Sequence, residues 1–117
     1  NGMPYKYCYG TNVHKKPFSI VKLNVDNGKD YLEMSYYQEN KNFLPSEPIF
    51  VENPNAKSED DGVLLVMVLA DQNDFLSVLD AKTLKEIARA EVPEQAKGGF
   101  TFHGFFADSK TFPKLNY

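Results

Sequence analysis

The chain has 117 residues, of which 42% are hydrophobic and 14% aromatic, and it carries a net charge of −3. This length suits one modest domain, and the composition is typical of a globular chain rather than a disordered one. The 13 lysines and arginines are scattered, which excludes the basic stripe of a nucleic-acid-binding protein, so we expect no nucleic-acid partner. The single Cys8 excludes an internal disulfide and favours an intracellular, cytoplasmic compartment.

Three alternating segments predict strands in the first third of the chain. Residues 5–9 alternate in part between aromatic and polar side chains and lead into Gly10, which predicts a short strand followed by a turn. Residues 19–25 and 31–36 also alternate with a period of two. The sequence between them contains Asp-Asn-Gly, a strong hairpin signal because Asn and Gly accept the positive φ of such turns. We therefore expect a β-hairpin here.

The middle of the chain begins with a polar surface loop at residues 38–44 and continues into a strand at residues 49–51. Pro45 and Pro48 lie between them, and because proline cannot donate a ladder hydrogen bond, this stretch must lie at a strand start or a sheet edge. Residues 52–61 have the composition of an exposed loop and end in three carboxylates. Consecutive carboxylates do not match the alternating ligands of a calcium loop, so we expect no calcium site.

An apolar run and a second hairpin are predicted next. Residues 63–70 are continuously apolar, which predicts a core strand buried on both faces. This run is too short for a membrane-spanning helix, which needs about 18–20 residues. Residues 75–79 and 86–92 predict strands joined by a turn at 80–83, although residues 85–90 alone also have helix propensity. We favour a strand because the turn echoes the earlier one at a spacing that suits propeller blades.

The two histidines of the chain have different surroundings. His14 lies in a polar segment beside Lys15 and Lys16, and we expect it to be solvated rather than to bind a metal. His103 lies among phenylalanines in residues 100–106, FTFHGFF. A lone histidine on an apolar strand is more often a core residue than a ligand. The local pattern alone therefore leaves both roles open for His103.

Three phrases of the sequence resemble the C-terminal end of the carotenoid cleavage oxygenases, the family of the animal carotene dioxygenases and the retinoid isomerohydrolase. They are residues 45–51 (PSEPIFV), 59–65 (EDDGVLL) and 79–104, from Leu-Asp-Ala-Lys to Phe-His-Gly. The resemblance implies an all-β chain whose residues 1–117 are the C-terminal part of a single seven-bladed β-propeller domain. We expect about two blades, the strand that bears the last metal ligand and a short tail. An N-terminal part not in this chain would complete the propeller.

The resemblance also implies a non-haem iron site. His103 corresponds to the last of four histidines that hold Fe(2+) in the family, and Glu47 to a carboxylate that orients a ligand histidine. Such an orienting carboxylate holds the remaining ring N–H, so that the other nitrogen faces the metal unprotonated. Phe102 corresponds to an aromatic wall of the substrate tunnel. The other three ligands would lie in the N-terminal part.

The resemblance implies an iron(II) dioxygenase that uses O₂ to cleave a carotenoid double bond to retinal-type aldehydes, with or without polyene isomerisation. We expect it to be active only with its N-terminal part. The length of the tail after Phe106 favours an invertebrate-type carotenoid isomerooxygenase. Two alternatives stay open: a retinoid isomerohydrolase with the same iron site, and a metal-free β-rich binding or scaffold segment in which His103 is a core residue. Any peripheral membrane contact is expected through parts outside this chain.

Overall fold

The computed structural model describes residues 5–13 and 18–92, and every regular element in them is a β-strand. A three-stranded antiparallel sheet has the order β1-β2-β3, from β1 (Tyr7–Asn12), β2 (Ser19–Asn24) and β3 (Tyr31–Ser35). A five-stranded sheet contains β4 (Leu44–Pro45), β5 (Ile49–Glu52), β6 (Gly62–Leu69), β7 (Phe75–Asp80) and β8 (Glu86–Glu91). Its path is β4-β6-β7-β8, and β5 pairs with β6 beside β4. In this part of the chain there is no helix that could cross a membrane.

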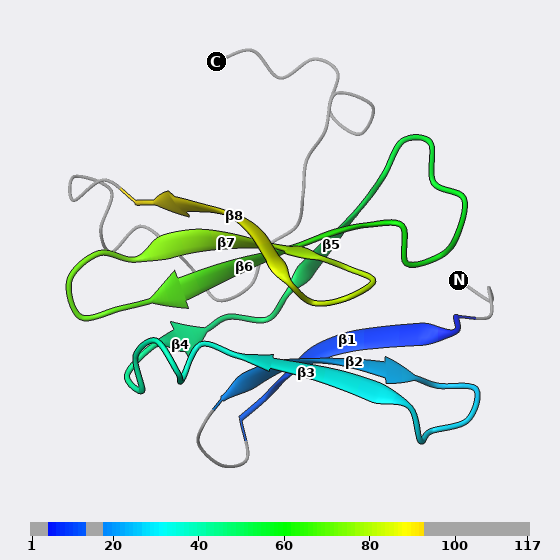
Figure 1. Cartoon of the computed structure of the whole chain (residues 1–117), viewed down its shortest axis with the longest axis horizontal. Helices are drawn as coiled ribbons and strands as arrows, with labels where there is room; N and C mark the ends of the chain where they lie inside the picture. The colour runs from blue at the N-terminus through cyan, green and yellow to red at the C-terminus, as the bar shows by residue number, and fades with distance from the viewer. Residues whose placement is uncertain (1–4, 14–17, 93–117) are drawn as a thin grey trace.

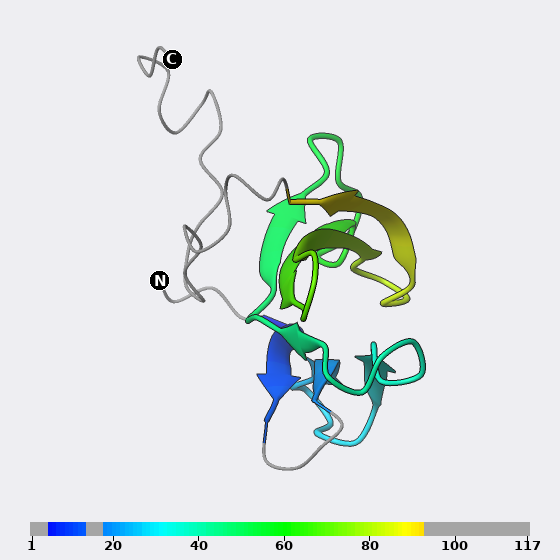
Figure 2. The same ribbon diagram turned by 90° about the vertical axis from the view of Figure 1, so that its left-hand side faces the viewer.

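The two sheets lie in separate halves of the molecule and are joined by the connection from β3 to β4 (Figure 1, Figure 2). Their facing sides share one core. Leu64, Val66 and Val68 of β6 are fully buried, and Ile20 of β2 joins the same cluster. Burial of these aliphatic side chains is the main favourable contribution to packing the sheets together. The site described below lies between β4 and β5 of the five-stranded sheet, where this sheet contacts β1.

The hairpins β2–β3 and β7–β8 contain a similar hydrogen-bonded turn. The amide of Gly28 donates to the carbonyl of Asn24 at 2.9 Å, and that of Leu84 donates to the carbonyl of Asp80 at 2.8 Å. Gly28 and Leu84 both have positive φ, 64° and 62°. Asp80 therefore occupies the position in the second hairpin that Asn24 has in the first. Leu84 is held in this unfavourable conformation because its side chain is buried in the core.

Two sequence expectations about strands were wrong. Gly10 lies inside β1, opposite Val21, and does not end the strand in a turn. A glycine interrupts a side-chain pattern without interrupting the ladder, since it keeps its backbone donor and acceptor. Along β6, burial alternates between fully buried and intermediate residues, so only one face is core. The continuous apolar run had suggested burial on both faces.

Gly62 is required by close backbone approach, which gives a testable prediction. A Cβ at Gly62 would overlap the carbonyl oxygen of Val51 and would lie 2.9 Å from the Phe50 ring. We expect Gly62→Ala to lower the local free energy of unfolding by about 1–3 kcal/mol, because the β5–β6 pair must move apart. Hydrogen exchange of the β6 amides measures this loss. Gly10→Ala is the control, since its Cβ would meet nothing within 4 Å. Equal exchange in both variants would contradict the prediction.

Candidate functional site

The segment that carries Glu47 is a bulge in a strand. At the β4 end, Leu44 pairs with Leu69. At the β5 end, Ile49 pairs with Leu65. The chain thus advances five residues on this side and four on β6, so one extra residue is accommodated between β4 and β5. Glu47 and the proline after it lie in this bulge, where a missing proline N–H removes no ladder bond. Bulges re-aim a side chain out of the regular alternation of a strand.

Ser46 fixes the bulge to both sheets. Its amide donates to the carbonyl of Met67 at 2.7 Å, and the Met67 amide donates to Ser46 Oγ at 3.0 Å. From the other sheet, Thr11 Oγ1 donates to the Ser46 carbonyl at 2.9 Å. Ser46 is buried, with 7% of its surface exposed. The backbone immediately before Glu47 is therefore held by β6 and by β1.

Glu47 is exposed and borders an open, largely apolar cavity of about 480 Å³. The described residues that line this cavity come from the end of β1, from the segments next to β1 and β2, from β4 and from the bulge: Thr11, Val13, Phe18, Leu44, Pro45, Ser46 and Glu47. Within that lining Glu47 is the one ionisable side chain. A carboxylate at the edge of an apolar cavity can accept a hydrogen bond from an N–H group placed there, and it retains a second oxygen for another partner.

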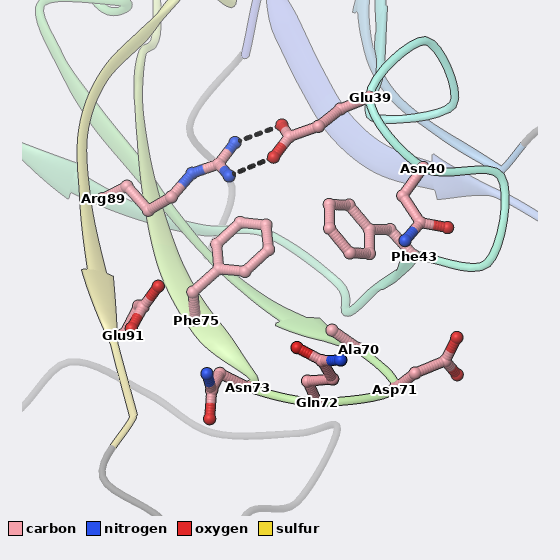
Figure 3. Close-up of a pocket in the computed structure, with 10 residues that line it drawn as sticks. All are labelled: Glu39, Asn40, Phe43, Ala70, Asp71, Gln72, Asn73, Phe75, Arg89 and Glu91. Atoms are coloured by element: carbon pink, nitrogen blue, oxygen red, sulfur yellow. Dashed lines mark hydrogen bonds and ion pairs between the residues drawn. The ribbon is translucent and has the colours of Figure 1, made fainter.

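A second cavity of about 300 Å³ lies beside Arg89 (Figure 3). Arg89 donates to both oxygens of Glu39 at 2.7 and 2.8 Å and to both oxygens of Glu86 at 3.2 and 3.0 Å. Its guanidinium also lies 4.0 Å from the centroid of the Phe75 ring. The hydrogen bonds that Arg89 donates to Glu39 are the main cause that raises the pKa of Arg89, and the same bonds lower the pKa of Glu39. Four of the five N–H donors of this arginine are thus engaged, so it ties β8 to the β3–β4 connection rather than offering a free anion site.

The acidic loop before β6 forms a second connection between the sheets. Lys22 of β2 contacts Asp60 at 2.7 Å, and the side chains of the pair are only 7% and 14% exposed. The carboxylate of Glu59 accepts the amides of Lys6 at 2.9 Å and Tyr7 at 2.8 Å at the start of β1. Residues 52–61 form a largely exposed loop, as expected. The sequence did not predict that the carboxylates of Glu59 and Asp60 bind amide and ammonium donors from the other half of the molecule.

The remaining predicted site residues, His103 and Phe102, lie outside the described residues, as does His14. Among residues 5–13 and 18–92 there is no group of three potential metal ligands. The sequence singled out Glu47 but did not indicate that Ser46 and Thr11 hold the backbone beside it. A small polar residue between two prolines in a strand could have indicated a bulge.

Comparisons with known proteins agree on one family. Residues 1–108 match the family model described as retinal pigment epithelial membrane protein. The chain is 41% identical over 110 residues to the mitochondrial carotenoid-cleaving dioxygenase of Mustela putorius furo, covering 91% of this chain and 19% of that protein. It is also 41% identical over 111 residues to the beta,beta-carotene 15,15'-dioxygenase of Gallus gallus, covering 91% of this chain and 20% of that protein.

Solved structures give the same relationship. A variant of the Synechocystis apocarotenoid oxygenase superposes with a TM-score of 0.68 at 29% identity, covering 78% of this chain and 20% of that chain. The cobalt-substituted form of the same oxygenase superposes with a TM-score of 0.66 at 29% identity, with the same coverage. The chain thus spans about a fifth of the length of the proteins it matches.

Proposed function

The chain belongs to the retinal pigment epithelial membrane protein family, the carotenoid cleavage oxygenases, and we propose that it is the C-terminal part of a non-haem iron(II) dioxygenase that cleaves a carotenoid double bond to retinal-type aldehydes. The observation that carries this proposal is the 41% identity to carotenoid dioxygenases from two animals across 91% of the chain. The geometry around Glu47 supports it, because this motif residue lies on a fixed bulge beside an apolar cavity.

We propose further that residues 1–117 supply about two blades of a seven-bladed β-propeller, with the rest supplied by an N-terminal part of the same protein. The β1–β3 sheet would form one blade, and β5 to β8 the four strands of the next. Large apolar side chains of the described residues support a need for further chain, since Tyr31 is 62% exposed and Ile87 59% exposed. Closing the ring would cover such surfaces and pair the open strand edges.

In this proposal His103 is one of four histidine ligands of the iron, and the other three come from the N-terminal part. The iron, when bound, supplies the redox and Lewis-acid chemistry that O₂ activation requires. Glu47 accepts the outward ring N–H of His103, which keeps the metal-facing nitrogen unprotonated and correctly aimed. Phe102 forms part of the wall that holds the polyene away from water.

The described residues are compatible with this role for Glu47. Its backbone is held on the side of β6 by Ser46, whose carbonyl is held in turn by Thr11. The cavity beside it is lined mostly by apolar surface. A histidine N–H placed at the edge of this cavity could donate to the Glu47 carboxylate.

The experiment that tests the proposal follows oxygen into the products. We expect the complete protein that contains this chain to bind iron and to convert a carotenoid, under isotopically labelled O₂, to aldehydes that carry label. Unlabelled retinoid alcohol from a retinyl ester would instead identify an isomerohydrolase. A complete, folded protein with neither iron nor product would identify a metal-free binding role. The 117-residue chain alone serves as the control, because it carries one proposed ligand and should not hold iron stoichiometrically.

A further inference from the structure

We propose that Ser46 and Thr11 are positioning residues that aim Glu47 at the iron-ligating histidine, so that strand β1 of one sheet controls the orienting carboxylate carried by the other. This inference rests on the proposed function, and it assigns roles to two residues that make no contact with the metal themselves. It is based on two hydrogen bonds at the bulge, in which the hydroxyls of Ser46 and Thr11 take the place of backbone partners.

At the bulge, the Ser46 hydroxyl takes the place of the Ser46 carbonyl as a hydrogen-bond acceptor in the sheet. In a regular antiparallel pair, Ser46 and Met67 would exchange both of their backbone bonds. Here the Ser46 amide still donates to the Met67 carbonyl, at 2.7 Å. The Met67 amide, however, donates to Ser46 Oγ at 3.0 Å. The hydroxyl therefore satisfies the Met67 amide, which releases the Ser46 carbonyl to turn out of the ladder.

The released carbonyl is captured by the other sheet. Thr11 Oγ1 donates to it at 2.9 Å, from near the C-terminal end of β1. Because the peptide group is planar, fixing the Ser46 carbonyl also fixes the amide of Glu47. On its other side, the Glu47 carbonyl accepts the Ser46 hydroxyl at 3.3 Å. Both peptide groups that flank the Glu47 side chain are thus held by hydroxyl groups of Ser46 and Thr11.

These two hydroxyls determine the direction in which Glu47 leaves the strand. A serine hydroxyl has one hydrogen to donate and lone pairs to accept, and Ser46 uses both functions here. Alanine at this position would leave the Met67 amide without its acceptor in a partly buried place. Misplacing a group by about 1 Å can lower an enzyme's rate about a hundredfold. Small changes in the hydrogen bonds that hold Glu47 should therefore change the iron affinity measurably.

Thr11→Val in the complete protein tests the inference, with iron affinity measured by competition with a chelator. Valine has the shape of threonine and no hydroxyl, so β1 is preserved while the Ser46 carbonyl loses its donor. We expect about tenfold weaker iron binding, the lower end of the range for outer residues of metal sites. Thr11→Ser is the matched control and should stay within about twofold, because it keeps the donor.

A double-mutant cycle separates positioning from a general loss of stability. If Thr11 acts through Glu47, Thr11→Val should cause no further weakening in the Glu47→Gln background. Equal weakening in both backgrounds, or no weakening in the presence of Glu47, would overturn the inference. If Glu47→Gln weakens iron binding and Thr11→Val does not, only the inference fails. If Glu47→Gln itself has no effect, the proposed pairing with His103 fails as well.

Hydrogen exchange provides a readout that does not involve the metal. In Ser46→Ala, the Met67 amide should exchange about tenfold faster, since it loses a hydrogen bond of ordinary strength. Amides in β8 serve as the internal reference. Unchanged protection of Met67 would overturn the part assigned to Ser46, and a variant that fails to fold leaves the Thr11 cycle as the deciding test.

Discussion

Replacing His103 with alanine is expected to abolish iron binding and carotenoid cleavage in the complete protein. The substitution removes one of four proposed ligands, and the remaining three cannot enclose the ion in the same geometry. Glu47→Gln is expected to have an intermediate effect. It keeps the shape of the side chain and removes the charge that orients the imidazole, and losses of this kind are typically about 10- to 100-fold in metal affinity or activity.

The measurements are iron per protein and aldehyde formation, made on variants shown to be folded. Glu52→Gln is the matched control for Glu47→Gln, since Glu52 is an exposed carboxylate at the end of β5, opposite Gly62. It should behave as the unmodified protein. Full iron occupancy in His103→Ala would refute the metal-ligand role. Equal behaviour of the two glutamine variants would refute the pairing of Glu47 with His103 and leave the family membership untouched.

Removing the cation of the Lys22–Asp60 pair is expected to cause a large loss of stability. Among the polar contacts between the two sheets, we expect this one to have the largest effect. Lys22→Met leaves the Asp60 carboxylate, whose side chain is 14% exposed, without its charged partner. The Lys22 ammonium also lies 4.2 Å from the centroid of the Tyr7 ring. We expect a loss of about 3 kcal/mol, because breaking a buried pair leaves an uncompensated charge. Hydrogen exchange of β2 and β6 amides measures the loss.

Two further variants define the cause of that loss. Lys29→Met is the control, since Lys29 is exposed in the β2–β3 turn. The double substitution of Lys22→Met with Asp60→Leu removes both charges and should recover much of the lost stability. Absence of recovery would show that the loss in Lys22→Met comes from the changed packing of the lysine stem and not from the unpaired charge of Asp60.

The same pair predicts a dependence on pH. Burial raises the pKa of Asp60, but hydrogen bonds from Lys22 and Ser58 and the attraction of Lys22 outweigh it, so the pKa lies below its ordinary value. A carboxyl whose pKa is lowered on folding contributes stability above its unfolded pKa, about 3.9, and loses it as pH falls through the folded pKa. Stability of the sheet contact should therefore decrease on acidification below about pH 4. The decrease should be smaller in Lys22→Met, because the lowering of the Asp60 pKa by Lys22 is lost while burial still raises it.

The sequence by itself determined the local elements and the family. The hairpins of β2–β3 and β7–β8 were predicted because turn residues between alternating segments act over a few residues of chain. The strand at Glu86–Glu91 was chosen correctly over a helix, because the echo of the first hairpin outweighed the helix propensity of the segment. Motif phrases such as PSEPIFV identified the family, which the match over residues 1–108 confirms.

Only the tertiary structure decided how Glu47 is held and how the two sheets are joined. The bulge at Glu47 depends on the register between β4, β5 and β6, and register is a property of two segments that are far apart in sequence. Likewise, Thr11 and Ser46 are 35 residues apart, and Lys22 and Asp60 are 38 apart. No local pattern in either partner specifies such contacts. Their energies come from burial and from pairing across the sheets, which arise only when both halves pack on the common core.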